Sequence, residues 1–213
     1  MKVRRILVAL ISGAALLSAA PVAQAAAPAG TPSDQCSATF REGDPRLGPD
    51  QLPSTGAVGR QLIGYRRTGG QSEQDFLATF YDSTAKSWRY PPSNGYLIGF
   101  NGQPVELDQT LVPGQDIDRY GSEYGSFLAP EGLPYTSRAI PPQSLDGTPA
   151  AGCNYHDYRV LKPFTVHAGP IAPWFDQIGL GWQYQLDASL VAGAPAQINV
   201  GWLVTNGYLE RLV

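Results

Sequence analysis

Glycine and proline interrupt this chain at close intervals, with 24 glycines and 19 prolines among its 213 residues, about a fifth of the total. Glycine weakens regular secondary structure and proline removes a backbone donor, so both residues tend to end helices and strands. A chain of this composition folds into short elements joined by many turns. We therefore expect few long helices.

Several short segments alternate apolar and polar residues with the two-residue period of a strand. Asn101-Gly102 and Pro113-Gly114 are turn signals next to such segments. One helix is expected at residues 72–80, where Ser72 can serve as the N-cap, and a second, short one at residues 173–177. These patterns predict an α+β fold dominated by antiparallel strands. The expected strands are at residues 95–100, 111–112, 117–120, 155–161, 183–186, 197–203 and 207–210.

Residues 1–25 have the pattern of an export signal. Three basic residues precede a short apolar stretch at residues 6–17, and Ala23-Gln24-Ala25 matches a signal-cleavage site. The alternative is a membrane anchor, but this stretch is shorter than the roughly 20 residues that span a bilayer. We expect a cleaved signal, a flexible lead-in at residues 26–35, and a secreted, extracellular mature protein without a membrane contact.

The charge of the mature chain excludes one class of partner. Without Lys2, Arg4 and Arg5, the 15 basic residues fall to 12 against 18 acidic ones, which gives a net charge of about −6. Nucleic-acid-binding proteins present a basic patch or stripe instead. We therefore expect no nucleic-acid partner.

The chain contains two cysteines, Cys36 and Cys153. An even pair in an exported protein predicts one disulfide bond, which would tie the mature N-terminus to the middle of the domain. The alternative is two free thiols. Because the sequence has neither a C-x-x-C pair nor a cluster of cysteine and histidine, we expect no metal site.

The most informative run lies at residues 118–130. A predicted strand delivers Arg119 and Tyr120 to a bend rich in glycine and serine, which includes Ser122. Backbone amides exposed in such a bend, together with a guanidinium group, can hold a phosphate. This run is therefore a candidate phosphate-binding segment.

A second arginine, Arg138, follows Arg119 in the same region and stands shortly before a Pro-Pro pair. Two arginines that converge suit the pyrophosphate of a dinucleotide. The alternative is that each arginine pairs with a nearby acid, such as Asp118 or Glu123, as in structural charge networks. The spacing alone does not decide between these two interpretations.

Five blocks of the sequence resemble the signature of the tuberculosis necrotizing toxin (TNT) family of NAD⁺ glycohydrolases. They follow the family's order, at residues 118–142, 154–158, 166–175, 181–184 and 201–209. Earlier segments, such as residues 46–49 and 90–92, are similar to secreted fungal NADases. The resemblance implies a small sandwich-like core of antiparallel strands at residues 105–213. It also implies a mixed N-terminal lobe of short helices and loops at residues 36–104.

The resemblance also implies roles for single residues. The arginine of the Asp-Arg-Tyr/Phe-Gly motif falls on Arg119, and the second active-site arginine falls on Arg138. The histidine of Tyr-His-x-Tyr falls on His156, and the glutamine of Gly-x-Gln-Tyr falls on Gln183. We expect Arg119, His156 and Gln183 to be catalytic and Arg138 to bind the substrate. Without the resemblance, His156 and Gln183 would be read as structural or surface residues.

An aromatic position near the nicotinamide falls on Phe127, where some relatives carry tyrosine. Tyr120 and Trp174 can complete a slot for the flat ring, and Ser122 is expected to bind substrate as well. As aromatic residues they fit a hydrophobic core equally well. The family's usual Gly-Gly-Gly-x-Gln-Tyr block is changed here by Leu180 and Trp182, so the fit of the ligand is open.

The residue types suit the chemistry that the resemblance implies. Nicotinamide in NAD⁺ is attached to ribose through a cationic ring nitrogen, so it leaves as a neutral molecule and needs no proton. Ordinary glycosidases use a carboxylic acid to protonate the leaving oxygen. An NAD⁺ glycohydrolase instead has to hold the dinucleotide, stabilise a ribose with oxocarbenium character and place one water. NAD⁺ or NADP⁺ is then the substrate, and no cofactor is expected.

Two other functions remain open from the sequence. The first is a transferase that moves ADP-ribose to a protein, although Gln183-Tyr184-Gln185 lacks the glutamate that such enzymes use. The second is a secreted module that binds NAD⁺ without cleaving it. Fungal relatives suggest a homodimer, but the sequence contains no pattern that identifies a dimer interface. Those relatives also carry a C-terminal extension associated with calcium, and since the sequence ends at Val213 we expect no calcium site.

Overall fold

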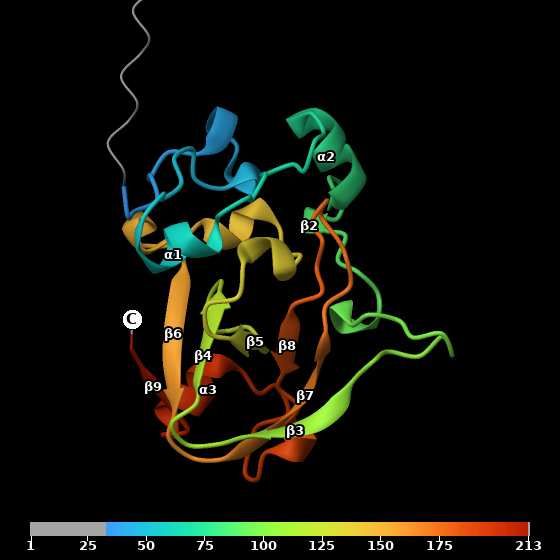
Figure 1. Ribbon diagram of the computed structural model, residues 1–213, viewed down its shortest axis with the longest axis vertical. Coiled ribbons are helices and arrows are strands. Elements are labelled where there is room, and N and C mark those ends of the chain that lie inside the picture. Colours follow the sequence, from blue (N-terminus) through green and yellow to red (C-terminus); the bar gives the residue numbers. More distant parts are fainter. Residues whose placement is uncertain (1–32, 213) are drawn as a thin grey trace, which may run out of the picture. The chain divides into compact units, whose positions relative to one another are not determined.

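Seven antiparallel strands form the central sheet of the computed structural model, which describes residues 33–212 (Figure 1). Their order is β3-β7-β8-β5-β4-β6-β9, so strands distant in the sequence become neighbours. The export signal expected at residues 1–25 lies outside the described residues, as does most of the lead-in. The strands are β3 (Leu107–Leu111), β4 (Asp116–Tyr120), β5 (Phe127–Pro130), β6 (Tyr155–Val160), β7 (Phe164–Pro170), β8 (Trp182–Gln185) and β9 (Leu209–Arg211).

The helices are short, as the glycine and proline content predicts. They are α1 (Gly56–Gln61), α2 (Glu73–Phe80) and α3 (Val200–Thr205), and a small hairpin of β1 (Tyr81–Asp82) and β2 (Ser87–Trp88) follows α2. No helix within residues 33–212 is long and apolar enough to traverse a lipid bilayer. The predicted β-dominated α+β fold is confirmed. The 3₁₀ helices are η1 (Arg41–Gly43), η2 (Pro45–Leu47), η3 (Ser93–Gly95), η4 (Tyr135–Ser137), η5 (Pro142–Leu145), η6 (Ala150–Gly152) and η7 (Ala188–Leu190).

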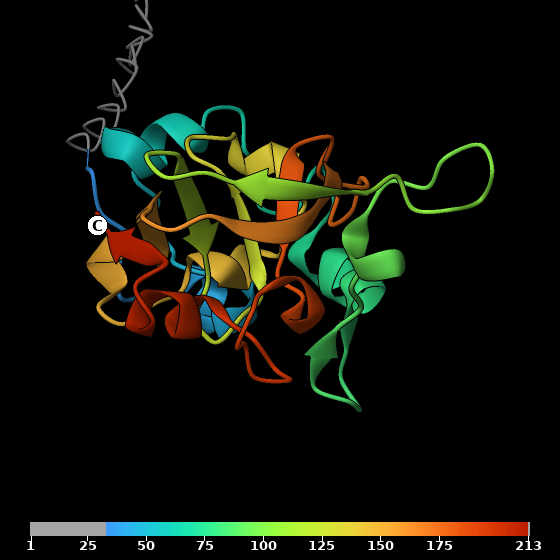
Figure 2. The same ribbon diagram turned by 90° about the horizontal axis from the view of Figure 1, so that it is seen from below.

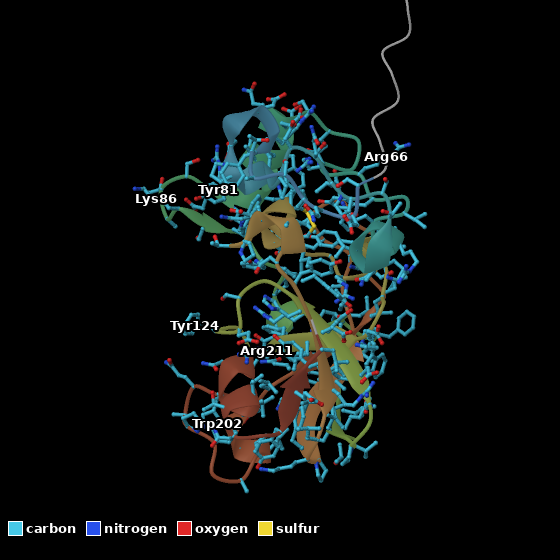
Figure 3. The ribbon with its side chains drawn as sticks, turned by 90° about the vertical axis from the view of Figure 1, so that its left-hand side faces the viewer. Arg66, Tyr81, Lys86, Tyr124, Trp202 and Arg211 are labelled. Carbon is cyan, nitrogen blue, oxygen red and sulfur yellow. A yellow bond between two sulfur atoms is a disulfide. The ribbon has the colours of Figure 1, made fainter. Side chains whose placement is uncertain are left out.

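The sheet is covered on both faces, because its strands present apolar side chains in both directions. On one face, residues such as Ile117, Leu128 and Tyr184 pack against Val200 and Leu203 of α3. Burying each such side chain contributes roughly 1.5–3 kcal/mol. In Figures 1 and 3, α3 lies toward one end of the strands, while helices α1 and α2 of the N-terminal segment (residues 33–95) lie toward the other.

On the opposite face, Tyr120 of β4 and Tyr155 of β6 pack against Val58 of α1 and against Leu62, the residue that follows this helix. Tyr135 is completely buried in this cluster, and its ring meets that of Tyr120 edge to face, with the ring centroids 5.0 Å apart. The N-terminal segment therefore covers the face of the sheet on which the candidate site lies. A third cluster, around Phe76 of α2, joins that segment to residues 174–175.

Most of the predicted elements form. Helix α2 begins after Ser72, whose side chain accepts a hydrogen bond from the backbone N–H of Asp75 and so caps the helix. Strands β4, β6, β8 and β9 also occupy predicted positions, within one or two residues. Strands β5 and β7 and helix α1 were not predicted from the sequence.

Three predicted elements are wrong. Helix α3 begins within residues 197–203, because Asn199 caps it and Val200 and Leu203 are spaced to share one helical face. Residues 173–177 form no helix, because Phe175 and Asp176 have positive φ and the chain reverses there. Residues 95–100 form only isolated bridges, and the following segment extends away from the neighbouring elements (Figure 2).

The two cysteines form the predicted disulfide bond. Cys36 and Cys153 have their Cα atoms 5.2 Å apart and are separated by 117 positions in the sequence. The bond ties the start of the N-terminal segment to the turn before β6. Asn154, the next residue, accepts a hydrogen bond from the N–H of Gly121 at 3.0 Å, so the disulfide borders the glycine-rich bend.

Replacing both cysteines by serine is expected to lower the free energy of unfolding by about 4–5 kcal/mol, because the closed loop is long. Urea denaturation of Cys36→Ser/Cys153→Ser beside the oxidised wild type measures this difference. A loss below about 1 kcal/mol would contradict a structural role for the bond. Reduction of the wild type with a thiol reagent should reproduce the effect of the double substitution.

Candidate functional site

Several residues predicted for the site line one cavity of about 80 Å³. This volume is smaller than the roughly 300–1,000 Å³ typical of a ligand pocket, so the cavity suits one end of an extended ligand. Ile140 and Ile171 contribute apolar lining. The predicted residues among its lining are Arg119, Tyr120, Phe127, Arg138 and Gln183.

Strand pairing explains why three of these side chains meet. Opposed residues in antiparallel neighbours project from the same face of a sheet. The registers of β4 with β5, and of β5 with β8, place Tyr120, Phe127 and Gln183 on one face. Arg119 starts from the opposite face, and its Nη1 donates a hydrogen bond to the Phe127 carbonyl at 2.6 Å. Its guanidinium group therefore reaches the cavity from the end of β4.

Gln183 is buried and held in one orientation by the N-terminal segment. Its Nε2 donates a hydrogen bond to the carbonyl oxygen of Asn94 at 3.0 Å. Gly95, next to Asn94, has φ of 81°, and a Cβ there would lie 3.8 Å from Oε1 of Gln183. Within residues 33–212, Oε1 accepts no hydrogen bond. The side chain thus presents a fixed, neutral acceptor.

Asp118 and Arg138 form a buried ion pair on this same face, since Asp118 lies two residues before Tyr120 in β4. Nη1 of Arg138 donates to Oδ1 of Asp118 at 2.6 Å, and Nη2 donates to Oδ2 at 2.7 Å. Their side chains are 0% and 5% exposed. Tyr155 and the backbone N–H of Gly132 also donate to Oδ2, at 3.1 and 2.9 Å. Asp118 is therefore fully occupied as an acceptor.

Helix α1 closes the network from the other side. Oε1 of Gln61 accepts hydrogen bonds from Tyr120 and from Nη2 of Arg138, both at 3.1 Å. The Arg138 guanidinium also lies 5.1 Å from the centre of the Tyr120 ring, within the range of a cation–π interaction. Arg138 thus shapes the cavity wall, and its pairing with Asp118 is one of the alternatives that the sequence left open.

Arg119 differs from Arg138 because it has no carboxylate partner within the described part of the chain. Its Nε donates to the carbonyl of Ser122 at 2.7 Å, and its guanidinium lies flat against Gly125. A Cβ on Gly125 would come 1.9 Å from Nη2, so only glycine fits there. Burial lowers the pKa of Arg119 from its usual value, but an arginine remains charged at neutral pH.

His156 and Ser122 line a different and larger hollow, of about 960 Å³, on the other side of the bend. His156 lies opposite Arg119 in the pairing of β6 with β4. Burial lowers the pKa of His156, and the nearby Glu123 partly opposes this shift, so the ring is neutral at pH 7. Figure 3 shows Tyr124, Trp202 and Arg211, which border this hollow, on the same side of the molecule.

Trp174 does not join either group of residues. Its Nε1 donates to the carbonyl of Arg89 at 2.7 Å, and its ring packs against that of Phe80 with the centroids 6.1 Å apart. It belongs to the cluster around Phe76 rather than to the lining of the Gln183 cavity. The structure therefore places Trp174 in the packing of the N-terminal segment.

Three polar residues that build or support the site were not predicted from the sequence. Asn94 and Gln61 come from the N-terminal segment, and Asp118 was considered only as an alternative partner for arginine. No local pattern marks a backbone carbonyl or a helix-end glutamine as a site residue. The proximity of Asp118 to Arg119 in the sequence was the one available signal.

No group of three or more potential metal-ligating side chains occurs among residues 33–212. The carboxylate that the cavity contains is that of Asp118, which is already neutralised by Arg138. The arrangement therefore offers a neutral amide, a fixed cation and aromatic walls, without a carboxylic acid that is free to donate a proton.

Asp157, near the site, has surroundings that disfavour the ionised form of its carboxyl group. It lies opposite Asp118 in the pairing of β6 with β4, and its Oδ1 is buried without a hydrogen-bond partner in the described residues. Burial raises its pKa from 3.8 to about 6, and the neighbouring Glu131, Asp118 and Asp116 add to this shift. The charged form of Asp157 is therefore unfavourable in the folded protein.

Because the folded chain binds this proton more tightly than the unfolded chain, Asp157 lowers stability as pH rises from 3.8 to about 6. Asp157→Asn is expected to raise Tm above pH 7 by about 2–4 °C and to change it little below pH 4. Thermal unfolding of both proteins across this pH range measures the difference. Equal Tm differences at both ends of the range would contradict this assignment.

Comparisons with known proteins identify relatives of this chain. Residues 110–212 match the family model described as tuberculosis necrotizing toxin (TNT). The chain is 41% identical over 177 residues to the conidial surface nicotinamide adenine dinucleotide glycohydrolase nadA of Aspergillus fumigatus, covering 82% of this chain and 71% of that protein.

A solved structure of tuberculosis necrotizing toxin, complexed with its immunity factor, has a similar fold. Its TM-score is 0.50 at 20% sequence identity, over 66% of this chain and 71% of that one. At this identity the match concerns the fold alone. It agrees with the strand-rich architecture described above.

Proposed function

Because this chain belongs to the tuberculosis necrotizing toxin (TNT) family, we propose that it is an NAD⁺ glycohydrolase that releases nicotinamide and ADP-ribose. One observation carries the proposal. Gln183 and Arg119, a neutral amide and a cation without a carboxylate partner in the described residues, line the same cavity. The acid in that cavity, Asp118, is held in an ion pair.

The reaction needs no acid, because the nicotinamide ring is already cationic before the bond to ribose breaks. The pair of available carboxylates on which ordinary glycosidases depend has no counterpart in this cavity. Phe127 and Tyr120 can enclose a flat ring and exclude water from it. The electron pair of the glycosidic bond then moves onto the ring nitrogen and neutralises it.

Gln183 is suited to act on the ribose side of that bond. Its Nε2 is fixed by Asn94, which leaves Oε1 to accept a hydrogen bond from a ribose hydroxyl or from the attacking water. An acceptor held in place before the reaction stabilises the transition state without reorganisation. The water adds to the ribose carbon and loses a proton to solvent.

Arg119 and His156 are assigned to the rest of the dinucleotide. Nη2 of Arg119 makes no hydrogen bond within residues 33–212 and can donate to a phosphate oxygen. His156 and Ser122 line the hollow on the other side of the same bend, large enough for the part of the dinucleotide that does not react. Arg138 supports the cavity wall instead of contacting the phosphates.

We extend the proposal to NADP⁺, because the larger hollow has room for an additional phosphate. We also propose that the enzyme acts outside the cell. The disulfide bond is typical of oxidising compartments, and the relative from Aspergillus fumigatus is named for the conidial surface.

The experiment is a nicotinamide-release assay on purified protein with NAD⁺ and NADP⁺ as separate substrates. We expect free nicotinamide with both, in step with formation of ADP-ribose or its phosphate. Absence of nicotinamide while calorimetry shows NAD⁺ bound would identify a binding module instead. ADP-ribose attached to a protein acceptor would identify a transferase.

A further inference from the structure

Glu123 belongs to the glycine-rich bend but takes no part in the chemistry proposed above. Its carboxylate is fully engaged. Nε and Nη2 of Arg211 in β9 donate to its two oxygens at 2.7 and 2.5 Å, and the hydroxyl of the buried Tyr158 donates to Oε1 at 2.9 Å. These bonds lower the pKa of Glu123, so it stays ionised and is a poor proton acceptor at neutral pH.

The backbone of the same bend is held by α3. The N–H of Gly201 donates to the carbonyl of Glu123 at 2.9 Å, and the N–H of Val200 donates to the carbonyl of Gly125 at 3.1 Å. The bend is thus attached to β9 by a side chain and to α3 by two backbone hydrogen bonds. Its conformation depends on elements near the end of the chain.

The inner side of the bend holds Arg119. The Ser122 carbonyl, adjacent to Glu123, accepts bonds from Nε of Arg119 at 2.7 Å and from the N–H of Gly125 at 3.1 Å. The guanidinium rests directly on Gly125. A displacement of the bend would therefore displace the guanidinium, since both contacts come from the backbone.

We infer that Glu123 is a positioning residue, which acts through the bend at residues 121–126 to fix the Arg119 guanidinium beside the cavity. The inference rests on the proposed function, because it concerns how Arg119 meets the phosphates of the dinucleotide. The Glu123–Arg211 pair holds the bend from outside, and the Ser122 carbonyl transmits that constraint to Arg119. An arginine that binds the unreacting phosphates contributes similarly to the ground state and the transition state.

The chain offers a matched control for this pair. Asp116 and Arg159 form a second two-bond pair, with both hydrogen bonds at 2.8 Å, between β4 and β6. Its arginine and carboxylate are 46% and 27% exposed, close to 53% and 20% for Arg211 and Glu123. This control pair has no hydrogen bond to the bend in the described structure. Asp116→Asn therefore removes an equivalent ion pair without loosening Arg119.

The test compares Glu123→Gln, Arg211→Gln and Asp116→Asn in the nicotinamide-release assay, with Gln183→Ala as a reference. We expect Glu123→Gln and Arg211→Gln each to raise KM for NAD⁺ about tenfold while kcat stays within about threefold. Asp116→Asn should change neither constant. Hydrogen exchange at the Gly125 amide should accelerate by about tenfold in the first two variants only.

The charge-reversed double variant Glu123→Arg/Arg211→Glu is expected to recover most of the KM, because it restores the link to β9. If KM for Glu123→Gln and for Arg211→Gln equals that for Asp116→Asn, the inference is overturned. The proposed function still stands in that case, provided that the wild type releases nicotinamide and Gln183→Ala does not. A wild type that releases no nicotinamide would overturn both. Exchange at Gly125 unchanged in both bend variants would show that the pair does not hold the bend.

Discussion

Gln183→Ala is expected to lower kcat for nicotinamide release by about a hundredfold to a thousandfold, the usual effect of removing one fixed polar group from a transition state. The alanine removes both the contact with Asn94 and the free Oε1. Because the acceptor acts on the reacting ribose, the loss should fall on kcat, and KM should change little.

The control for this substitution is Gln185→Ala. Gln185 lies two residues further along β8, projects from the same face and does not line the cavity. It should leave kcat within about twofold, since most surface substitutions have small effects. Equal activity in the two variants would contradict the role given to Gln183. Steady-state kinetics measures kcat and KM for both variants, and circular dichroism checks that both are folded.

Asp118→Asn is expected to lower the free energy of unfolding by about 3–5 kcal/mol, because it leaves the Arg138 guanidinium charged and buried without its counterion. A domain of ordinary stability has only about 5–15 kcal/mol in total, so the variant should unfold at much lower urea concentration. Activity should fall as well, since Arg138 packs on the Tyr120 ring that lines the cavity.

Two comparisons make this prediction specific. Asp116→Asn breaks an exposed pair and should cost about 1 kcal/mol or less. Adding Arg138→Met to Asp118→Asn should recover part of the lost stability, because it removes the uncompensated charge. If Asp118→Asn is no more destabilised than Asp116→Asn, the buried pair is not a structural element of the site. Urea denaturation measures all of these variants.

Much of the fold follows from local patterns in the sequence. Alternation located β4, β6 and β8, and Ser72 located the start of α2. It failed at residues 197–203, where apolar residues fit both a strand and one face of a helix. The Asn199 side chain caps the helix by accepting a hydrogen bond from the backbone N–H of Trp202. This bond is visible only in the folded structure.

Site residues that belong to a short sequence motif could be predicted. Residues that support them from distant parts of the sequence could not. Arg119 and Gln183 stand in short motifs, and the structure gives them one cavity. The support for these residues comes from Gln61 and Asn94, which are brought close only when the N-terminal segment folds over the sheet. Arg138 was predicted to bind the substrate, and its pairing with Asp118, one of the alternatives that the sequence left open, shows only in the folded structure.

The most direct test of the account compares NAD⁺ with NADH in the same assay. In the proposed mechanism Gln183 and Arg119 suffice because the departing ring is cationic and leaves as a neutral molecule, with no acid in the cavity free to protonate it. The reduced ring of NADH has no such charge and would leave as an anion. We predict release of nicotinamide from NAD⁺ and no cleavage of NADH. Cleavage of NADH at a comparable rate would contradict the account.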